Sequence, residues 1–283
     1  MKLQDLLAET ARKFSSCGIE SAQADAEILL SFVLEITRGD LLAKAVTGEE
    51  ILGDQLDEFL ILAERRASRE PLQHLTGVAY FRTLELKVGP GVFVPRFETE
   101  TVVERALQLL SEIPVAKPVV VDLATGSGAI ALSVAVERPQ AKVFAVELSE
   151  DALNYTRFNF AKYAPSAVLV QGDLAEAFPD LAGEVDLLIS NPPYIPNDMI
   201  PIYPEVHLHD PSLALYGGSD GLDMLRTVAE RGLELVKPGG KLVIEHADMQ
   251  GAAVRQILLD LGWQDVVTVK DLAGRDRMVS ARR

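Results

Sequence analysis

A regular alternation of strand-like and helix-like segments between residues 118 and 283 constrains the fold more than any other feature of the sequence. The strand-like segments are short, apolar and rich in Val, Ile and Leu, which is typical of strands buried on both faces of a sheet. The last two have no helix between them, so they should pair antiparallel. We therefore predict an α/β fold with a doubly wound, Rossmann-like sheet that is mostly parallel and has an antiparallel last strand. The predicted strands span 118–123, 142–147, 167–171, 185–190, 241–245, 265–270 and 277–281, and the predicted helices span 128–136, 149–163, 221–236 and 251–261.

The N-terminal part of the chain shows apolar residues at helical spacing instead, in three stripes. The stripes cover residues 3–14, 22–33 and 52–63. Ser21 should act as the N-cap of the second helix. Charged residues surround each stripe and no catalytic constellation is present, so we predict the core faces of a small all-α domain over residues 1–75. Such a domain could dock another molecule or could only support the rest of the chain.

A β-rich segment follows the helical pattern. Residues 80–87 and 91–94 favour strands, and Gly89-Pro90-Gly91 lies between them. We therefore predict a β-hairpin linker over residues 76–97, which joins the helical domain to a second domain over residues 98–283.

Composition excludes several classes of protein. The charge is 27 − 42 = −15, and such an acidic balance argues against a surface that grips nucleic-acid backbone. Cys17 is the only cysteine, so we expect a reducing compartment and a small buried apolar residue at this position. No segment has the pattern of a signal peptide or a membrane span, so we predict a cytoplasmic protein without a membrane partner. We predict no metal site, because the four histidines lack ligand spacing; they are His74, His207, His209 and His246.

The sequence Asn191-Pro192-Pro193-Tyr194 follows a predicted strand directly. Two prolines end the strand because neither can donate to a ladder, and open α/β sheets bind ligands at such strand ends. The Asn191 side-chain oxygen and the Pro192 carbonyl are acceptors, and Tyr194 offers a flat face for stacking. These groups suit a planar group with two N–H bonds, such as a primary amide or an exocyclic amine. In isolation, the same residues would indicate only a strand-ending turn with an Asx cap.

A Gly-rich turn at residues 124–128 follows the first predicted strand of the second domain. It is neither a Walker loop nor a complete dinucleotide-binding motif. Asp122 would repel a pyrophosphate and suits an amino or cationic group, Glu147 at the next strand end suits a ribose diol, and Asp173 can accept from an adenine amino group. A Gly-rich turn with these acids and no phosphate clamp indicates S-adenosylmethionine as the cofactor.

These motifs together resemble a known family, the release factor glutamine methyltransferases, and the resemblance covers nearly the whole chain. The Asn-Pro-Pro-Tyr sequence alone is shared with amino-methylating DNA enzymes, but its combination with residues 95–100 is specific. The resemblance implies methyl transfer to the side-chain amide nitrogen, N5, of the glutamine in the Gly-Gly-Gln motif of peptide chain release factors, which act in translation termination. The features in family order are the helical domain, the hairpin, Pro95-Arg96 with Glu98-Thr99-Glu100, the Gly-rich turn, the Asn191 loop, and Gly217-Gly218 with Asp220-Gly221-Leu222.

The resemblance also implies roles for individual residues. Asn191, Pro192 and Tyr194 would be catalytic, and with Pro193 they would hold the substrate glutamine. The Gly-rich turn would hold the methionine part of the cofactor, Glu147 the ribose, and Asp173 with Leu174 the adenine. Ala124 departs from the family, in which glycine is common at this position. The predicted cofactor-binding residues are Asp122, Ala124, Thr125, Gly126, Ser127, Gly128, Glu147, Asp173, Leu174 and Asn191.

Other functions stay open at this point. An amino-methyltransferase acting on adenine or cytosine shares the same loop, although the acidic charge and the lack of a basic target-recognition segment count against it. A nucleotide-binding protein without catalysis is a third class, against which the intact Asn191 loop counts. Arg96 is either a surface charge or a contact to substrate or cofactor, just before a helix that should end near residue 113. We expect a monomer that acts on a protein substrate without direct nucleic-acid contact, and under the family resemblance we predict that the helical domain over residues 1–75 docks the release factor.

Overall fold

The computed structural model describes all 283 residues, which form two compact units. The first unit comprises Met1–Val78 together with Pro201–His209, and the second comprises Ala79–Ile200 together with Asp210–Arg283. The return of residues 201–209 to the first unit was not expected from the sequence. No helix combines the length and the apolar character that crossing a bilayer requires.

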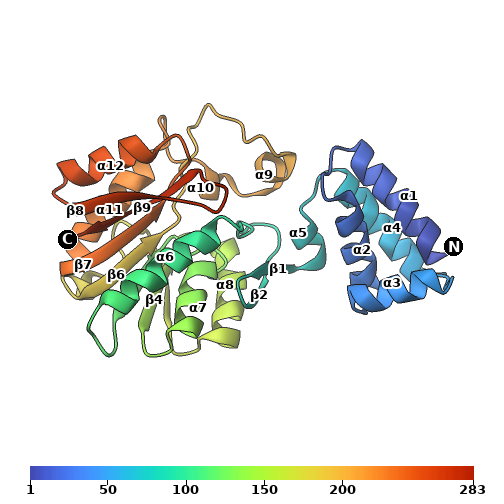
Figure 1. Ribbon diagram of the computed structural model, residues 1–283, viewed down its shortest axis with the longest axis horizontal. Coiled ribbons are helices and arrows are strands. Elements are labelled where there is room, and N and C mark those ends of the chain that lie inside the picture. Colours follow the sequence, from blue (N-terminus) through green and yellow to red (C-terminus); the bar gives the residue numbers. More distant parts are fainter. The chain divides into compact units, whose positions relative to one another are not determined.

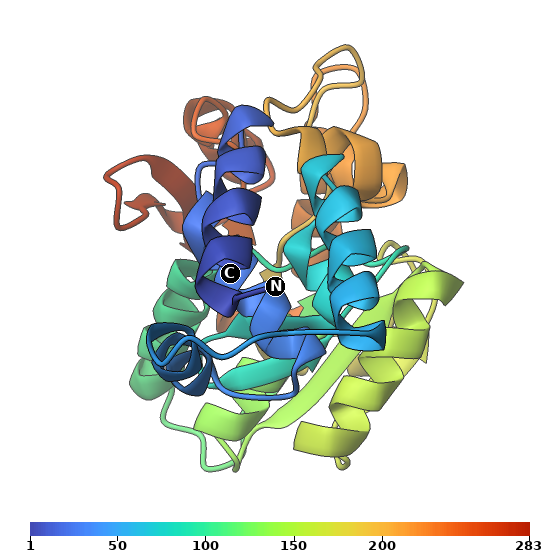
Figure 2. The same cartoon turned by 90° about the vertical axis from the view of Figure 1, so that its right-hand side faces the viewer.

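The first unit is helical, and its helices between residues 3 and 67 pack side by side in Figures 1 and 2. Its core contains fully buried side chains from several helices, among them Phe14, Leu29, Leu30 and Phe59. The predicted all-α character of this part is therefore confirmed. Its helices are α1 (Leu3–Ser16), α2 (Ala22–Val33), α3 (Arg38–Val46), α4 (Asp54–Ala67), α5 (Leu72–Thr76) and α9 (Pro204–His209).

Several details of this unit differ from the predictions. Helix α3 carries no predicted stripe, and of the third stripe Leu52 and Leu60 are exposed. Ser21 occupies the N-cap position, but its hydroxyl donates to the Asp25 carboxylate, 2.7 Å away, rather than accepting from the helix backbone. Cys17 is exposed rather than buried, because it lies at the C-cap of α1, where the chain turns away from the core.

A buried ion cluster ties the elements of this unit together. Arg66 is 5% exposed, and its Nε donates to Asp25 Oδ2 at 2.7 Å. Another guanidinium nitrogen of Arg66 donates to Glu205 Oε1 at 2.9 Å, and Arg69 binds both oxygens of the same carboxylate. Glu205 belongs to α9, so these bonds fix residues 201–209 to the helical unit.

A two-stranded sheet of β1 (Val78–Phe81) and β2 (Leu84–Lys87) precedes the large sheet. The predicted hairpin around Gly89-Pro90-Gly91 is therefore wrong in register, since the connection lies at Arg82 and Thr83. Arg82 adopts φ 51°, and its backbone N–H donates to Glu100 Oε1 at 2.9 Å, which holds the tighter turn. Residues 91–94 form no strand, although Val92 and Val94 are buried.

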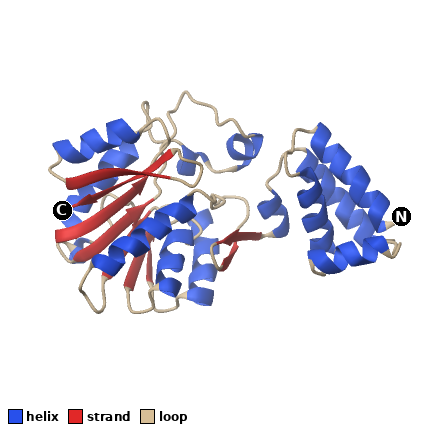
Figure 3. Ribbon diagram, viewed as in Figure 1, coloured by secondary structure: helices blue, strands red, loops and turns tan.

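The second unit is built on a seven-stranded sheet, which Figure 3 shows in red among flanking helices. The strand order is β5-β4-β3-β6-β7-β9-β8, with parallel pairs from β5 to β7 and antiparallel pairs from β7 to β8. The predicted Rossmann-like topology is confirmed, including the antiparallel edge. The strands are β3 (Val119–Leu123), β4 (Lys142–Glu147), β5 (Val168–Gln171), β6 (Val185–Ser190), β7 (Val236–Glu245), β8 (Gln264–Lys270) and β9 (Asp276–Arg282).

Helices cover both faces of this sheet. Side chains alternate along each strand, so that Leu187 and Ile189 of β6 join one core while Leu188 joins the other. The first core includes residues of α6 (Thr99–Glu112), α7 (Ala129–Glu137) and α8 (Glu150–Tyr163), and the second includes residues of α11 (Asp223–Leu235) and α12 (Gly251–Asp260). The remaining short helices are α10 (Ser212–Leu215) and a 3-10 turn at Pro179–Leu181.

One strand boundary differs from the prediction. Pro238-Gly239-Gly240 was expected to close a helix before a short strand, but these residues lie inside β7. Pro238 lacks a backbone N–H, and the pairing of β6 with β7 accordingly shifts register between Val185 and Leu187.

Replacing Arg66 with Met is expected to destabilise the helical unit by about 3 kcal/mol, because Asp25 would be left as a buried charge without its partner. Native-state hydrogen exchange of the α2 amides measures the loss as a smaller opening free energy. Lys44→Ala serves as the control, since its pair with Glu49 is exposed and removal should cost less than about 1 kcal/mol. Equal losses in the two variants would contradict the role of the buried cluster.

Candidate active site

The centre of the sheet brings the two main motifs together. Strands β3 and β6 pair in parallel, with Leu123 opposite Ser190 at their carboxyl ends. The Ser190 hydroxyl donates to the Leu123 carbonyl at 2.6 Å and joins the two ends further. The chain continues from β3 to β4 and from β6 to β7, and β4 and β7 lie on opposite sides of the central β3–β6 pair. The carboxyl ends of β3 and β6 are therefore the switch point at which such sheets bind ligands.

The Gly-rich turn after β3 adopts a backbone that few residue types tolerate. Ala124, Gly126 and Gly128 have φ values of 61°, 56° and 89°. Ala124 is the non-glycine among them, at a cost of about 1 kcal/mol. A side chain at Gly128 would meet the Phe160 ring at 2.9 Å, whereas one at Gly126 would meet nothing within 4 Å. The turn is therefore packed at Gly128 and open at Gly126.

Asp122 lies beneath this turn and is fully buried. Its Oδ2 accepts from the Thr125 hydroxyl at 2.6 Å and from the Ala131 backbone N–H at 3.1 Å, while its Oδ1 has no hydrogen-bond partner. Burial raises the pKa of this carboxyl to about 7. Asp122 thus joins the turn to the first residues of α7, and a contact with a ligand amino group stays a prediction.

Glu147 ends β4 beside the same turn. Its two carboxylate oxygens accept from the backbone N–H groups of Gly126 and Ser149, each at 2.8 Å. Each oxygen keeps a second lone pair, so the carboxylate can still accept from a hydroxyl. These two hydrogen bonds fix the position of the Glu147 carboxylate through the backbone of two successive loops.

Asp173 and Leu174 follow β5 at the next strand end. Asp173 is exposed, and its Oδ1 accepts from the Ala175 N–H at 2.9 Å as an Asx turn. Leu174 is buried in the second core of the sheet. Strand β5 is the neighbour of β4 in the sheet, so Asp173 and Leu174 follow a carboxyl strand end next to the one that carries Glu147.

Two polar residues that the sequence reasoning missed also hold the turn. Thr156 and Asn159 in α8 are fully buried. The Thr156 hydroxyl donates to the Gly126 carbonyl at 2.6 Å, and the Asn159 amide donates to the Ser127 carbonyl at 2.9 Å. The signal was available, because both residues fall on the apolar face of α8 with Leu153 and Phe160.

The Asn191 loop leaves β6 beside the Gly-rich turn. Asn191 is half-buried and its Nδ2 donates to Thr99 Oγ1 at 3.4 Å, while Pro192 is buried. The Tyr194 hydroxyl donates to Glu245 Oε1 at 3.2 Å. Burial, followed by the neighbouring Glu245 carboxyl, raises the pKa of Tyr194, so its hydroxyl keeps its proton.

Glycines support this loop from behind. A side chain at Gly217 would lie 2.5 Å from the Pro193 carbonyl oxygen, and one at Gly221 would lie 2.4 Å from that of Tyr194. Gln250, a further residue that sequence reasoning missed, donates to the Tyr194 carbonyl at 2.8 Å. A lone glutamine at the start of α12 offered no pattern that could have indicated this contact.

Arg96 forms an ion pair with Asp210 and lies over the Phe93 ring, 4.8 Å from its centre. Asp210 is buried, and this burial raises its pKa to about 6 although Arg96 acts in the opposite direction. The guanidinium therefore has a structural partner within the second unit. No cluster of three or more metal-ligating side chains is present anywhere in the chain.

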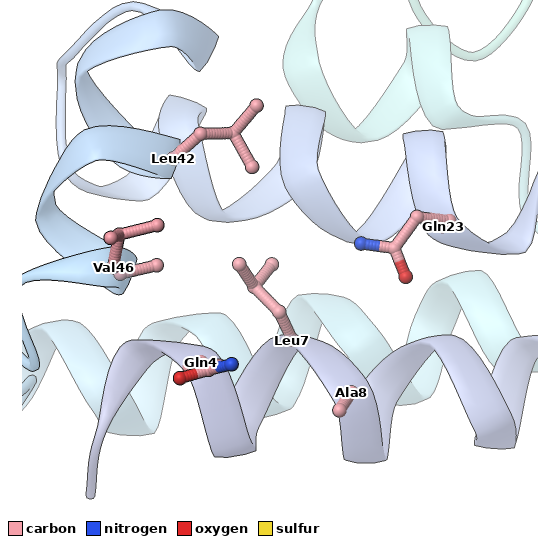
Figure 4. Close-up of a pocket in the computed structure, with 7 residues that line it drawn as sticks. Gln4, Leu7, Ala8, Gln23, Leu42 and Val46 are labelled. Atoms are coloured by element: carbon pink, nitrogen blue, oxygen red, sulfur yellow. The ribbon is translucent and has the colours of Figure 1, made fainter.

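A separate pocket of about 270 Å³ lies in the helical unit, between α1, α2 and α3. Figure 4 shows the side chains that line it, which are mostly apolar. Val46 at its rim is 86% exposed. The lining residues are Gln4, Leu7, Ala8, Gln23, Leu42, Ala45 and Val46.

The family models assign this Rossmann-like sheet, with its Gly-rich turn and strand-end carboxylates at the switch point, to the methyltransferases. The family model described as "Methyltransferase small domain" matches residues 84–200, and that described as "PrmC N-terminal domain" matches residues 5–77. A solved structure titled as a methyltransferase from Pyrococcus furiosus has the same fold, with a TM-score of 0.54 and 20% identity; the match covers 78% of this chain and 98% of that one.

Curated relatives narrow the class further. The release factor glutamine methyltransferase of Streptomyces coelicolor is 46% identical, and the match covers 98% of each chain. That of Bifidobacterium longum is 43% identical over 99% of each chain, and that of Deinococcus radiodurans is 40% identical over 100% of this chain and 99% of its own. The chain therefore belongs to the release factor glutamine methyltransferase family.

Asp122→Asn is expected to weaken the pH dependence of stability. The pKa of Asp122 in the folded protein, about 7, exceeds its ordinary value of 3.8, so the folded state binds more protons and the unfolding free energy falls as the pH rises between these values. Glu245, with a pKa of about 7, acts in the same direction, so the dependence should shrink rather than vanish. Urea unfolding at pH 5 and pH 7 measures the difference, with the exposed Asp180→Asn as control. An unchanged difference would show that Asp122 is not the titrating group.

Proposed function

We propose that this enzyme transfers the methyl group of S-adenosylmethionine to the N5 amide nitrogen of the glutamine in the Gly-Gly-Gln motif of peptide chain release factors. The observation that carries the proposal is the position of the Asn191 loop, which leaves β6 directly beside the Gly-rich turn at the end of β3. A planar amide held by this loop would lie at the switch point, where the cofactor of such a fold is bound.

The chemistry of an amide nitrogen explains what the loop has to supply. The nitrogen is a poor nucleophile because its lone pair is delocalised into the carbonyl. Asn191 Oδ1 and the Pro192 carbonyl would accept its two N–H bonds and turn the lone pair toward the methyl group. Their dipoles favour the positive charge that develops on nitrogen, and the Tyr194 ring would pack on the amide plane. Positioning then contributes much of the rate, and the proton leaves to water after transfer.

The residues of the second unit fit S-adenosylmethionine, which supplies an electrophilic methyl group when it is bound. The space in front of Gly126 is open, as close approach of the methionine part requires. Glu147 has lone pairs left for a ribose diol, and Asp173 is exposed at the neighbouring strand end for the adenine amino group. Thr125, Ser127 and Leu174 are buried, so they would act mainly by shaping these surfaces.

Gly126→Ala is expected to lower the affinity for S-adenosylmethionine by about tenfold or more, because the new methyl group would occupy the open space. Calorimetric titration of the folded variant measures the dissociation constant. Gly274→Ala is the matched control, since Gly274 also has a positive φ and open surroundings but lies between β8 and β9. If both variants bind the cofactor like the parent protein, the methionine part does not lie at Gly126.

The substrate assay uses S-adenosylmethionine with a labelled methyl group and four acceptor conditions. These are a release factor, the same factor with its Gly-Gly-Gln glutamine replaced by alanine, duplex DNA, and the release factor with the Asn191→Ala enzyme. We expect label only in the first, with Asn191→Ala losing at least about a hundredfold in kcat while cofactor affinity stays. Asn197→Ala, exposed on the same loop, should keep its activity.

Other distributions of label would contradict the proposal. Label in the DNA would favour the amino-methyltransferase on nucleic acid, and label in the alanine form of the release factor would place the modified residue elsewhere. The family resemblance also counts Asn191 among the cofactor-binding residues, and a loss of cofactor affinity in Asn191→Ala would favour that role over the substrate contact.

We also propose that the helical unit docks the release factor, with the pocket between α1, α2 and α3 as part of the contact. The support is its apolar lining and the exposure of Val46 and Leu42 at its rim. The catalytic chemistry requires none of these residues, so an exposed apolar surface here suggests a contact with a protein.

Val46→Asp is expected to raise the KM for the release factor about fivefold, because a charge at the rim would be buried on docking. The kcat at saturation should stay, since Val46 takes no part in transfer. Leu52→Asp is the control, because Leu52 is also strongly exposed in this unit but does not line the pocket. A KM that changes equally in both variants, or in neither, would exclude the pocket as the docking site.

A further inference from the structure

A fully buried carboxyl lies next to the transfer site without a role in the mechanism above. Glu245 is the last residue of β7, and Ile244 pairs with Ser190 of β6. Glu245 therefore lies beside Asn191, the residue that follows Ser190. The side chain is 1% exposed, and its Oε2 has no hydrogen-bond partner. Burying a carboxyl group costs free energy, so an apolar side chain would give a more stable protein if this position were purely structural.

Two hydroxyl groups point to this carboxyl from the loop and from α6. The Tyr194 hydroxyl donates to Oε1 at 3.2 Å, and Thr99, at the first position of α6, lowers the pKa of the same carboxyl as a hydrogen-bond donor. Thr99 is itself buried, and its Oγ1 accepts from Asn191 Nδ2 at 3.4 Å. One carboxyl is thus connected to both polar side chains of the Asn191 loop.

The direction of these hydrogen bonds decides how the Asn191 amide is turned. The Thr99 hydroxyl has a single proton, which it gives to Glu245, so toward Asn191 it can only accept. The amide must then present its Nδ2 to Thr99 and leave Oδ1 for another partner. Without Glu245, Thr99 could donate to Asn191 instead, and the amide could rotate to present the wrong atom to a substrate N–H.

We propose that Glu245 is a positioning residue, which fixes the Asn191 amide through Thr99 and the Tyr194 ring through its hydroxyl, so that Oδ1 faces the substrate. The kinetic part of this inference rests on the proposed amide methyl transfer. Burial raises the pKa of Glu245 to about 7 although Thr99, Arg277 and Tyr194 act in the opposite direction. The role requires only an accepting oxygen, which the protonated and the ionised carboxyl both offer.

The test compares Glu245→Leu with Glu245→Gln in the full chain. Leucine removes the accepting oxygen at similar volume, so kcat should fall about tenfold or more while the affinity for S-adenosylmethionine and the KM for the release factor stay within about threefold. Glutamine keeps an accepting oxygen and should restore kcat to within about threefold of the parent enzyme. An equal loss in both variants, or no loss in Glu245→Leu, would overturn the proposal.

Thr99 provides a second pair of variants, should Glu245→Leu fail to fold. Thr99→Val breaks the connection to Asn191 and should lower kcat like Glu245→Leu, whereas Thr99→Ser keeps the hydroxyl and should retain it. Full activity of Thr99→Val, with the fold intact, would show that Asn191 needs no orientation from this side.

A spectroscopic readout separates this inference from the proposed function. In isotope-labelled enzyme, the side-chain NH₂ signals of Asn191, assigned by their loss in Asn191→Ala, should exchange slowly with solvent in the parent and in Glu245→Gln. They should exchange faster in Glu245→Leu and Thr99→Val. If the parent enzyme transfers no label, the proposed function fails, but these signals still decide whether Glu245 orients Asn191. Equal exchange in all four proteins would overturn the positioning role.

Discussion

The parallel pairing of β3 with β6 is the constraint on which the site depends. It sets the ends of two strands, distant in sequence, side by side, and Ser190 fastens them with a hydrogen bond to Leu123. From there the chain winds outward in opposite directions, so the loops after these strands diverge and leave the sheet edge open between them. The Gly-rich turn and the Asn191 loop each occupy one of these two positions.

Buried polar side chains then convert two flexible loops into fixed surfaces. Thr156 and Asn159 donate to carbonyls of the Gly-rich turn, and Asp122 accepts from the Thr125 hydroxyl of the same turn. Gln250 donates to the Tyr194 carbonyl of the Asn191 loop. Loop backbones carry many groups that secondary structure does not satisfy, and Thr156, Asn159 and Gln250 each satisfy a loop carbonyl in this way. The site is consequently organised by the protein itself, which reduces the reorganisation needed during transfer.

The carboxyl groups around the site serve different purposes, set by burial and hydrogen bonding. Glu147 accepts from two backbone N–H groups and keeps accepting capacity toward the open edge. Asp122 and Glu245 are fully buried with a raised pKa. Asp122 accepts from the Thr125 hydroxyl and the Ala131 N–H, and Glu245 accepts from the Tyr194 hydroxyl, so neither carboxyl is bonded directly to a cation. The first keeps lone pairs for the proposed ribose contact, whereas Asp122 holds the Gly-rich turn and Glu245 holds the Tyr194 hydroxyl. A sequence presents all three simply as acids near strand ends.

Local sequence patterns were enough to predict the α/β class, most strand positions and the order of the motifs, because burial of both sheet faces imposes a strong local pattern on every strand. They also placed Asn191 and Glu147 at strand ends. The hairpin register, the exposure of Cys17 and the packing of residues 201–209 with the helical unit were decided only by tertiary structure. So were the contacts of Gln250 and Glu245 with Tyr194. The packing of residues 201–209 and the contacts of Gln250 and Glu245 depend on hydrogen bonds between residues far apart in the chain, for which local periodicity carries no signal.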